Sequence, residues 1–141
     1  MHSHVIWGID DGARTRDESL EMLARAAAAG TQVLFATPHV APVFGYPLTR
    51  ARRTLARRHL EQLRAAAPPG LELRAGWEVT PSAERLEPSD DLEALRLEGT
   101  SAILIDGPQN GPWSGDPYLF PLVARVVAHG LVPIVAHPER R

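Results

Sequence analysis

The sequence predicts an α/β protein built on a parallel sheet, and three observations lead to this fold class. Short apolar runs typical of buried strands alternate with longer stretches in which apolar residues recur at helical spacing. Glycine and proline mark the boundaries between these segments. With 141 residues, of which 44% are hydrophobic and 23% charged, the chain has the size and composition of one globular domain. Strands that alternate with helices are typical of parallel βαβ units.

The first part of the chain contains three predicted strands and two predicted helices. The first predicted strand ends at residues 4–6, and the other two extend over residues 32–36 and 71–79. Asp17 can cap a helix that runs to Ala29 and ends at Gly30. A second helix is predicted over residues 49–67, and the prolines and glycine at 68–70 end it.

The second part continues the same alternation. It contains a short predicted helix over residues 90–97, a strand over 101–105, a Gly/Pro-rich loop over 107–117, a helix over 118–129 capped by Gly130, and a final strand over 132–136. The sequence has no internal repeat and no linker long enough to separate domains. We therefore expect a single domain over residues 1–141.

Residue types and segments that the sequence lacks exclude several classes of function. The chain has no cysteine, which excludes disulfides, thiolate zinc sites and cysteine nucleophiles. The net charge is −2 and all 15 basic residues are arginine, so the six arginines between Arg50 and Arg64 indicate a solvated helix face rather than a nucleic-acid surface. The sequence shows no signal peptide and no apolar run of the ~18 residues that a membrane span needs. We expect a soluble, cytoplasmic protein that neither binds nucleic acid nor inserts into a membrane.

Side chains that can bind metal ions accompany every predicted strand. They are His2 and His4 on the first strand, His39 after the second, Glu78 near the end of the third, Asp106 after the fourth and His137 after the fifth. Because the carboxyl ends of parallel strands lie at one edge, we expect these side chains to converge. Imidazoles with carboxylates suit Zn²⁺, Mn²⁺ or Fe²⁺, and two or more such ions would activate water and hold a phosphate for in-line displacement. Arg140 suits an oxyanion clamp beside a metal ligand.

Each of these residues also has an ordinary structural interpretation. His39 can be an exposed loop histidine, Glu78 a surface carboxylate at a strand end, and Asp106 a turn residue. The pair His2-x-His4 alone is as consistent with a structural origin as with a metal site. The repetition of ligand-type residues at five strands favours the metal site.

The glycine-flanked segment Gly8–Gly12 carries two aspartates, Asp10 and Asp11. Each can be a hydrogen-bonded turn residue. Alternatively, one carboxylate orients an imidazole or helps to position the attacking water. The remaining histidines, His59 and His129, lie in predicted helices, and we interpret both as structural.

Together, these residues occur in motifs whose order and spacing resemble a known family. The motifs are His2-Ser3-His4, Gly8-Ile9-Asp10-Asp11-Gly12-Ala13, Glu18-Ser19-Leu20, Ala36-Thr37-Pro38-His39, Gly76-Trp77-Glu78 and Ala136-His137-Pro138-Glu139-Arg140. They resemble the bacterial manganese-dependent tyrosine phosphatases of capsular and exopolysaccharide synthesis, which belong to the polymerase and histidinol phosphatase (PHP) superfamily. The resemblance runs the whole length of the chain.

The resemblance implies part of a distorted (β/α)₇ barrel with two or three metal ions, Mn²⁺ above all, at the C-terminal strand ends. It places metal-ligand positions at His2, His4, His39, Glu78 and His137. Asp106 stands where the family has a glutamate ligand, and Arg140 matches the phosphate-binding arginine. The implied reaction is hydrolysis of phosphotyrosine on a polysaccharide-synthesis autokinase by metal-activated hydroxide. We hypothesise from the residues themselves that Asp10 or Asp11 assists as a base.

Two departures from the family pattern bear on whether the site is complete. Only Met1 precedes His2, where the family has a few apolar residues and an aspartate, and the chain ends after the fifth predicted strand, before the family's late Asp-x-His pair. We therefore expect about five βα units and an open sheet edge that favours association. The alternative functions are another PHP phosphoesterase, of the histidinol-phosphate type, and a non-catalytic metal-binding remnant.

Overall fold

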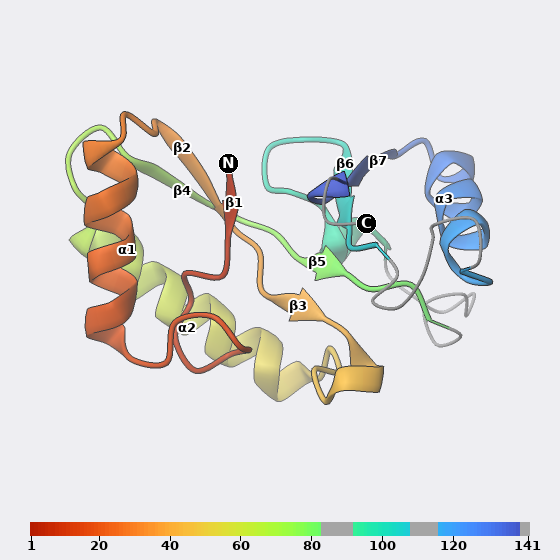
Figure 1. Ribbon diagram of the computed structural model, residues 1–141, viewed down its shortest axis with the longest axis horizontal. Helices are drawn as coiled ribbons and strands as arrows, with labels where there is room; N and C mark the ends of the chain where they lie inside the picture. Colours follow the sequence, from red (N-terminus) through yellow and green to blue (C-terminus); the bar gives the residue numbers. More distant parts are fainter. Residues whose placement is uncertain (83–91, 108–115, 139–141) are drawn as a thin grey trace. The chain divides into compact units, whose positions relative to one another are not determined.

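The chain forms two compact units, each with its own parallel sheet (Figure 1). The computed structural model describes residues 1–82, 92–107 and 116–138. Unit 1 comprises Met1–Pro38 and Leu48–Gly76, and unit 2 comprises His39–Pro47 and Trp77–Arg141. All strand pairs within the two sheets are parallel, which confirms the predicted α/β class with parallel sheets.

Unit 1 is a three-stranded sheet with two helices. The strand order is β1 (His2–Ser3), β2 (Val33–Ala36) and β4 (Glu72–Ala75), and the helices are α1 (Arg16–Ala28) and α2 (Arg50–Ala66). The core is apolar, with Leu23 of α1, Leu34 of β2 and Leu63 of α2 at 2% exposure or less. At the surface of β4, the hydrogen bond from Arg74 lowers the pKa of Glu72 below its ordinary value.

The cap of helix α1 lies two residues before the predicted cap. The hydroxyl of Thr15, not the carboxylate of Asp17, caps the helix by accepting from the backbone N–H of Glu18. The carboxylate of Glu18 in turn accepts from the N–H of Arg14. This reciprocal pair satisfies two exposed donors at once, which explains why the helix starts at Arg16. Helix α2 lies within the predicted range 49–67, with Thr49 as its cap.

Unit 2 is a four-stranded sheet with one helix. The strand order is β3 (His39–Val40), β5 (Glu78–Val79), β6 (Ala102–Ile105) and β7 (Val132–Val135), and the helix is α3 (Leu119–Ala128). Two short 3₁₀ turns cover Pro42–Phe44 and Leu92–Leu95. Every residue of β6 is buried, as expected for a continuous apolar run in the middle of a parallel sheet.

Three strand and helix predictions need correction. The predicted strand over 71–79 is two strands, β4 and β5, separated at Gly76-Trp77. The strand predicted to end at residues 4–6 is β1 at His2–Ser3, and Val5 and Ile6 are buried outside it. The helix predicted over 90–97 is the single 3₁₀ turn at Leu92–Leu95, while residues 90 and 91, like 108–115 of the predicted loop, lie outside the described residues.

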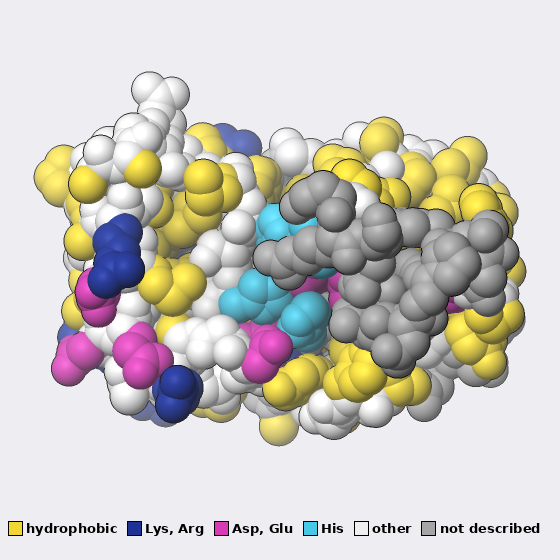
Figure 2. Space-filling view, in the orientation of Figure 1, with side chains coloured by type: hydrophobic (Ala, Val, Ile, Leu, Met, Phe, Trp, Pro, Cys, Tyr) yellow, Lys and Arg dark blue, Asp and Glu magenta, His cyan; other side chains and the backbone are white. Residues whose placement is uncertain are grey.

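Large hydrophobic side chains are exposed on α3 and β7, where Figure 2 shows apolar surface. Within the described part of the sheet, β7 pairs only with β6. Phe120, Val127, Val132, Ile134 and Val135 are between 38% and 61% exposed. This agrees with the apolar sheet edge that the sequence predicts, and association through it stays a prediction. None of the helices in the described ranges is long and apolar enough to cross a membrane.

Candidate metal centre

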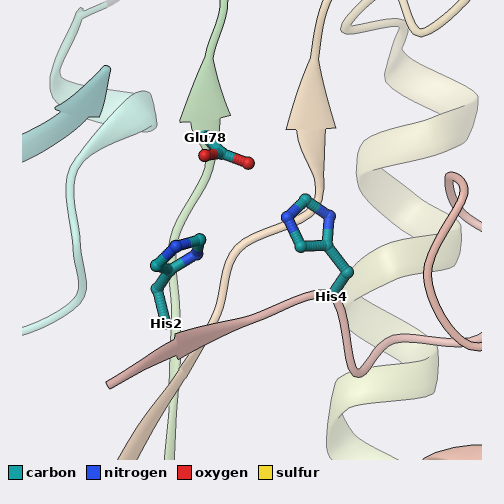
Figure 3. A group of neighbouring side chains, drawn as sticks. All are labelled: His2, His4 and Glu78. Atoms are coloured by element: carbon teal, nitrogen blue, oxygen red, sulfur yellow. The ribbon is translucent and has the colours of Figure 1, made fainter. Parts of the chain in front are cut away.

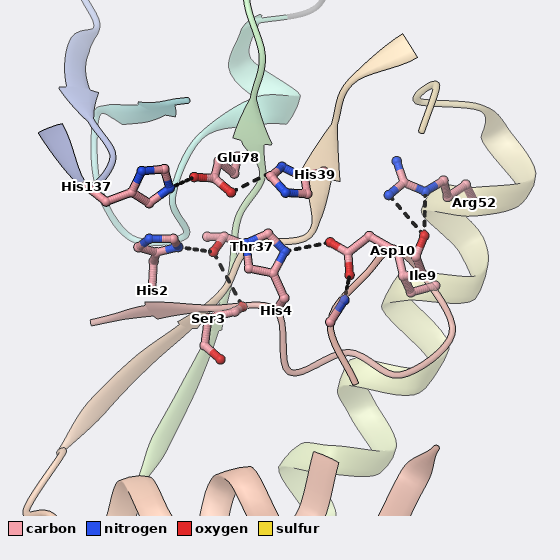
Figure 4. A network of polar contacts seen from close by, with 11 residues as sticks. His2, Ser3, His4, Ile9, Asp10, Thr37, His39, Arg52, Glu78 and His137 are labelled. Carbon is pink, nitrogen blue, oxygen red and sulfur yellow. Dashed lines mark hydrogen bonds and ion pairs between the residues drawn. The ribbon is translucent and has the colours of Figure 1, made fainter. Parts of the chain in front are cut away.

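The centre of the candidate site in unit 2 is the buried carboxylate of Glu78. Glu78 is the first residue of β5, and its side chain has 0% exposure. Its Oε1 lies 2.9 Å from Nε2 of His137, and its Oε2 lies 3.2 Å from Nδ1 of His39 (Figure 4). His39 opens β3, the strand paired with β5, at the position in register with Glu78. The sheet register therefore brings one carboxylate between two imidazoles.

A second buried carboxylate joins this group. Asp106 directly follows β6, its side chain is 1% exposed, and its Oδ1 lies 3.8 Å from Nε2 of His137. Glu78, Asp106 and His137 each offer one ligand-type atom, and these atoms lie within 4.8 Å of one another. Three of the four sequence-predicted ligands in unit 2 thus converge, Glu78 from the start of β5 and the other two from positions after β6 and β7. His39 contacts the same Glu78.

The backbone of His137 adopts a conformation that is rare for a side-chain-bearing residue. Its φ is 33°, the only positive value at a non-glycine position among the described residues. Left-handed backbone of this kind costs about 1–3 kcal/mol and persists where the surroundings hold it. Here the conformation accompanies the contact of the His137 ring with Glu78.

The charges of this group fit a divalent cation. Two carboxylates buried close together repel each other unless positive charge lies beside them. Imidazole nitrogens and carboxylate oxygens are the donors that Zn²⁺, Mn²⁺ and Fe²⁺ accept. The side chains of His39 and His137 are 19% and 12% exposed, and histidine side chains reach the surface on the face in Figure 2.

Unit 1 has its own pair of histidines, His2 in β1 and His4 directly after it. The rings of His2 and His4 project from the same side of the chain, with centroids 6.0 Å apart (Figure 3). His2 Nδ1 lies 3.2 Å from Oγ1 of Thr37, whose hydroxyl donates to the backbone carbonyl of Ser3. Since that hydroxyl has a single proton, His2 Nδ1 is the donor to Thr37. Nε2 of His2 therefore carries the lone pair that can bind a metal ion.

Asp10 fixes the second ring in the same way. Its Oδ2 lies 2.7 Å from Nδ1 of His4, and its Oδ1 accepts from the N–H of Gly12. A carboxylate accepts hydrogen bonds, so Nδ1 of His4 carries a proton, and in the neutral ring Nε2 carries the lone pair. Of the two interpretations of Asp10 given by the sequence, the structure combines both: it is a turn residue and it orients an imidazole.

Asp11 has a different environment from Asp10. Its side chain is exposed, and it lines a cavity of about 290 Å³ together with residues of α1. Glu18 and Glu21 share this cavity with Arg14 and Arg25, so its charge is mixed. A carboxylate oxygen of Asp11 nevertheless lies within 4.8 Å of a ring nitrogen of His4. Its catalytic role stays a prediction, as does that of Arg140, which lies outside the described residues.

Sequence reasoning missed several residues that hold this site. Thr37 lies within a recognised motif, yet its bond to His2 is visible only in the structure. Tyr46 stacks on His39 with ring centroids 6.1 Å apart. Arg52 and His59 of α2, interpreted as a solvated residue and a structural residue, contact the loop that carries Asp10. His129 contacts the carbonyl of Arg125 at the end of α3, which agrees with a structural role.

A family model and curated relatives are similar to this chain over nearly its whole length. A family model described as capsular polysaccharide synthesis, CpsB/CapC, matches residues 1–141. The chain is 29% identical over 146 residues to the tyrosine-protein phosphatase YwqE of Bacillus subtilis, covering 99% of this chain and 54% of that protein. It is 25% identical over 142 residues to the tyrosine-protein phosphatase CpsB of Streptococcus agalactiae, covering 99% of this chain and 56% of that protein.

A solved structure extends this similarity to three dimensions. It comes from work on YwqE of Bacillus subtilis and CpsB of Streptococcus pneumoniae, described as metal-dependent tyrosine phosphatases. The TM-score is 0.75 at 30% identity, over 99% of this chain and 55% of the solved chain. The chain thus spans about half the length of the curated relatives that it matches. Because the family model matches the chain from its first residue to its last, the protein belongs to the CpsB/CapC family of capsular polysaccharide synthesis.

Proposed function

We propose that this protein is a metal-dependent protein-tyrosine phosphatase that acts in capsular or exopolysaccharide synthesis. The observation that carries the proposal is the group of two buried carboxylates and two imidazoles around Glu78. The names of its relatives, tyrosine-protein phosphatases, support the reaction class. The proposed substrate is phosphotyrosine on a partner protein, the autokinase of polysaccharide synthesis.

The residues that would hold metal ions are those predicted from the sequence. In unit 2 they are His39, Glu78, Asp106 and His137, and in unit 1 they are His2 and His4. We propose Mn²⁺ as the metal, with Zn²⁺ and Fe²⁺ as the alternatives that the same donors accept. When bound, such ions act as Lewis acids and lower the pKa of coordinated water.

The chain's own side chains prepare this chemistry. Thr37 and Asp10 keep the protons of His2 and His4 on Nδ1, so that in the neutral rings Nε2 carries the lone pair. Asp10, already bonded to His4, or the exposed Asp11 would accept a proton during the reaction. Arg140 would neutralise charge on the phosphoryl oxygens, for which a guanidinium is well suited.

The finer points of the fold belong to the same proposal. We propose that the parallel strands are about five βα units of a PHP-type barrel and that residues 1–141 act as one functional domain. The similarity to the YwqE and CpsB structures supports this assignment. A cytoplasmic location stays a prediction.

The test is hydrolysis of a phosphotyrosyl peptide by the metal-free protein after addition of Mn²⁺. We expect turnover that needs Mn²⁺, stops with EDTA and is lost in His137→Ala. His129→Ala is the matched control, because His129 lies in the same unit at the exposed end of α3. Preference for histidinol phosphate would favour the other phosphoesterase class. Metal binding without turnover of either substrate would favour a non-catalytic remnant and contradict the proposal.

A further inference from the structure

The loop between β1 and α1 carries Asp10 and folds back on itself. The N–H of Gly8 donates to the carbonyl of Ala13 over 2.9 Å, and the N–H of Ala13 donates to the carbonyl of His4 over 3.1 Å. These bonds close the loop, yet neither touches the Ile9–Asp10 peptide from which the carboxylate projects. Within the loop, the N–H of Gly12 donates to the Asp10 carboxylate, and a residue of helix α2 holds the carbonyl of the Ile9–Asp10 peptide.

Helix α2 supplies that support through two side chains. Nε and Nη2 of Arg52 both donate to the carbonyl oxygen of Ile9, each over 3.2 Å (Figure 4). His59 lies with its ring stacked on Trp7 at a centroid distance of 3.9 Å and an interplanar angle of 8°. The Nδ1 atom of His59 is also 3.0 Å from the carbonyl oxygen of Trp7.

We propose that Arg52 and His59 are positioning residues that orient the metal-binding ring of His4 through Asp10. The carbonyl held by Arg52 belongs to the peptide that joins Ile9 to Asp10, so fixing this oxygen fixes the plane from which the Asp10 side chain departs. The 2.7 Å bond that Asp10 accepts from Nδ1 of His4 then fixes the proton on that nitrogen. His59 anchors the loop on the other side of Gly8 through Trp7.

The contacts of these two residues set them apart from their neighbours on α2. Arg57 and Arg58 are exposed, whereas Arg52 and His59 are partly buried against the loop. A guanidinium that donates two hydrogen bonds to one carbonyl constrains its direction more than a single bond does. In this way, one face of a helix far along the sequence controls the tautomer of a histidine next to the N-terminus.

The direct test uses the metal-free protein and the tautomer of His4, read from long-range ¹H–¹⁵N correlations of the histidine rings. We expect the wild-type ring to be protonated at Nδ1 alone. In Arg52→Ala we expect a mixture of both tautomers, with Arg52→Lys partly restoring the wild-type signal because lysine can still donate to Ile9. Arg57→Ala is the matched control and should leave the His4 signals unchanged.

Two variants of His59 separate its stacking on Trp7 from its hydrogen bond to the Trp7 carbonyl. His59→Phe keeps a ring against Trp7 and removes the bond to its carbonyl, whereas His59→Ala removes both. We expect the His4 tautomer to shift more in His59→Ala than in His59→Phe. If the signals of His4 stay at the wild-type position in both Arg52→Ala and His59→Ala while denaturant stability falls, these residues only stabilise the fold and the inference is wrong.

A second measurement connects the inference to the proposed function, on which the role of His4 as a ligand rests. We expect Arg52→Ala to weaken Mn²⁺ binding by about 10- to 100-fold, the usual effect of removing support for a metal ligand. Arg57→Ala should bind as the wild type does. If the wild type binds no Mn²⁺, the proposed function fails, and the tautomer measurement still decides the inference by itself.

Discussion

Replacement of Gly12 by alanine tests the geometry of the Asp10 loop most sharply. A Cβ atom at position 12 would lie 2.2 Å from the carbonyl oxygen of His4 and 2.4 Å from its Cβ. Ordinary van der Waals contact begins at 3.4 Å, so the two backbone segments must move apart. The obstacle is backbone rather than the end of a flexible side chain, and rotation of a side chain cannot relieve it.

The cost follows from the bonds that this movement breaks. The N–H of Ala13 donates to the same carbonyl of His4, and the N–H of Gly12 donates to Asp10. Each lost bond costs about 1 kcal/mol, and the remaining strain of overpacking costs about 1–3 kcal/mol. We therefore expect Gly12→Ala to reduce the free energy of unfolding by about 3–5 kcal/mol and to release Asp10 from His4.

Urea unfolding of the metal-free protein measures this loss, and Gly30→Ala is the control. Gly30 has a φ of 81° and no atom within 4 Å of an added Cβ, so its replacement costs only the left-handed backbone, about 1–2 kcal/mol. The ring signals of His4 should change in the Gly12 variant and stay constant in the Gly30 variant. A Gly12→Ala protein as stable as Gly30→Ala, with an unchanged His4 ring, would refute the reasoning.

Three further predictions concern the core, a surface pair and the metal site. Leu122→Ala on α3, at 1% exposure, should lower the free energy of unfolding in urea by about 2–5 kcal/mol. Val127→Ala, at a site 57% exposed on the same helix, should change this free energy by less than about 0.5 kcal/mol, and equal losses would contradict the packing of unit 2. Arg74→Ala should raise the pKa of Glu72 toward its ordinary value, which NMR of the carboxyl carbon follows, and an unchanged pKa would contradict the contact. Because the folded pKa is lowered, the stability that this pair contributes is present above the unfolded pKa and is lost as the pH falls through the folded pKa. Asp106→Asn should weaken Mn²⁺ binding at least ~10-fold in calorimetry. Asp116→Asn removes the same charge near the start of α3 and should leave Mn²⁺ binding unchanged. Equal binding by the two variants would show that Asp106 is not a ligand.

Much of the fold could be predicted because local signals agree with the packing. The apolar run of β6 is buried throughout, as a central parallel strand must be. Helix α2 begins after Thr49 and ends before the prolines, both of which are readable from sequence. At α1 the predicted cap Asp17 is wrong, because Thr15 accepts from the N–H of Glu18 and the Glu18 carboxylate accepts from the N–H of Arg14.

The broken strands could not be predicted from hydrophobicity alone. The run from residue 71 to 79 is apolar enough for one strand, but Gly76 and Trp77 separate β4 from β5. This break matters for the candidate site. Glu78 opens β5 instead of ending the predicted strand, and it therefore pairs in register with His39 of β3.

The candidate ligands could be predicted from motif order, but their supports could not. Asp106 and His137 follow β6 and β7, where the carboxyl ends of parallel strands meet, and Glu78 joins them although it opens β5. Arg52 is one of six arginines in its segment, and its partner Ile9 lies 43 residues away in the sequence. Composition and periodicity do not distinguish such an arginine from its solvated neighbours.

Calorimetric titration of Mn²⁺ into the metal-free protein tests the central claim, that the group around Glu78 binds a divalent metal ion. The informative variant is Glu78→Gln, which keeps the shape of the side chain and removes the charge that lies between His39 and His137. Glu93→Gln, at a surface carboxylate paired with Arg96, is the control. We predict saturable binding to the wild type and to Glu93→Gln, weakened at least ~100-fold in Glu78→Gln, which corresponds to about 2.8 kcal/mol. Equal affinity in Glu78→Gln and the wild type, or no binding by either, would contradict the account.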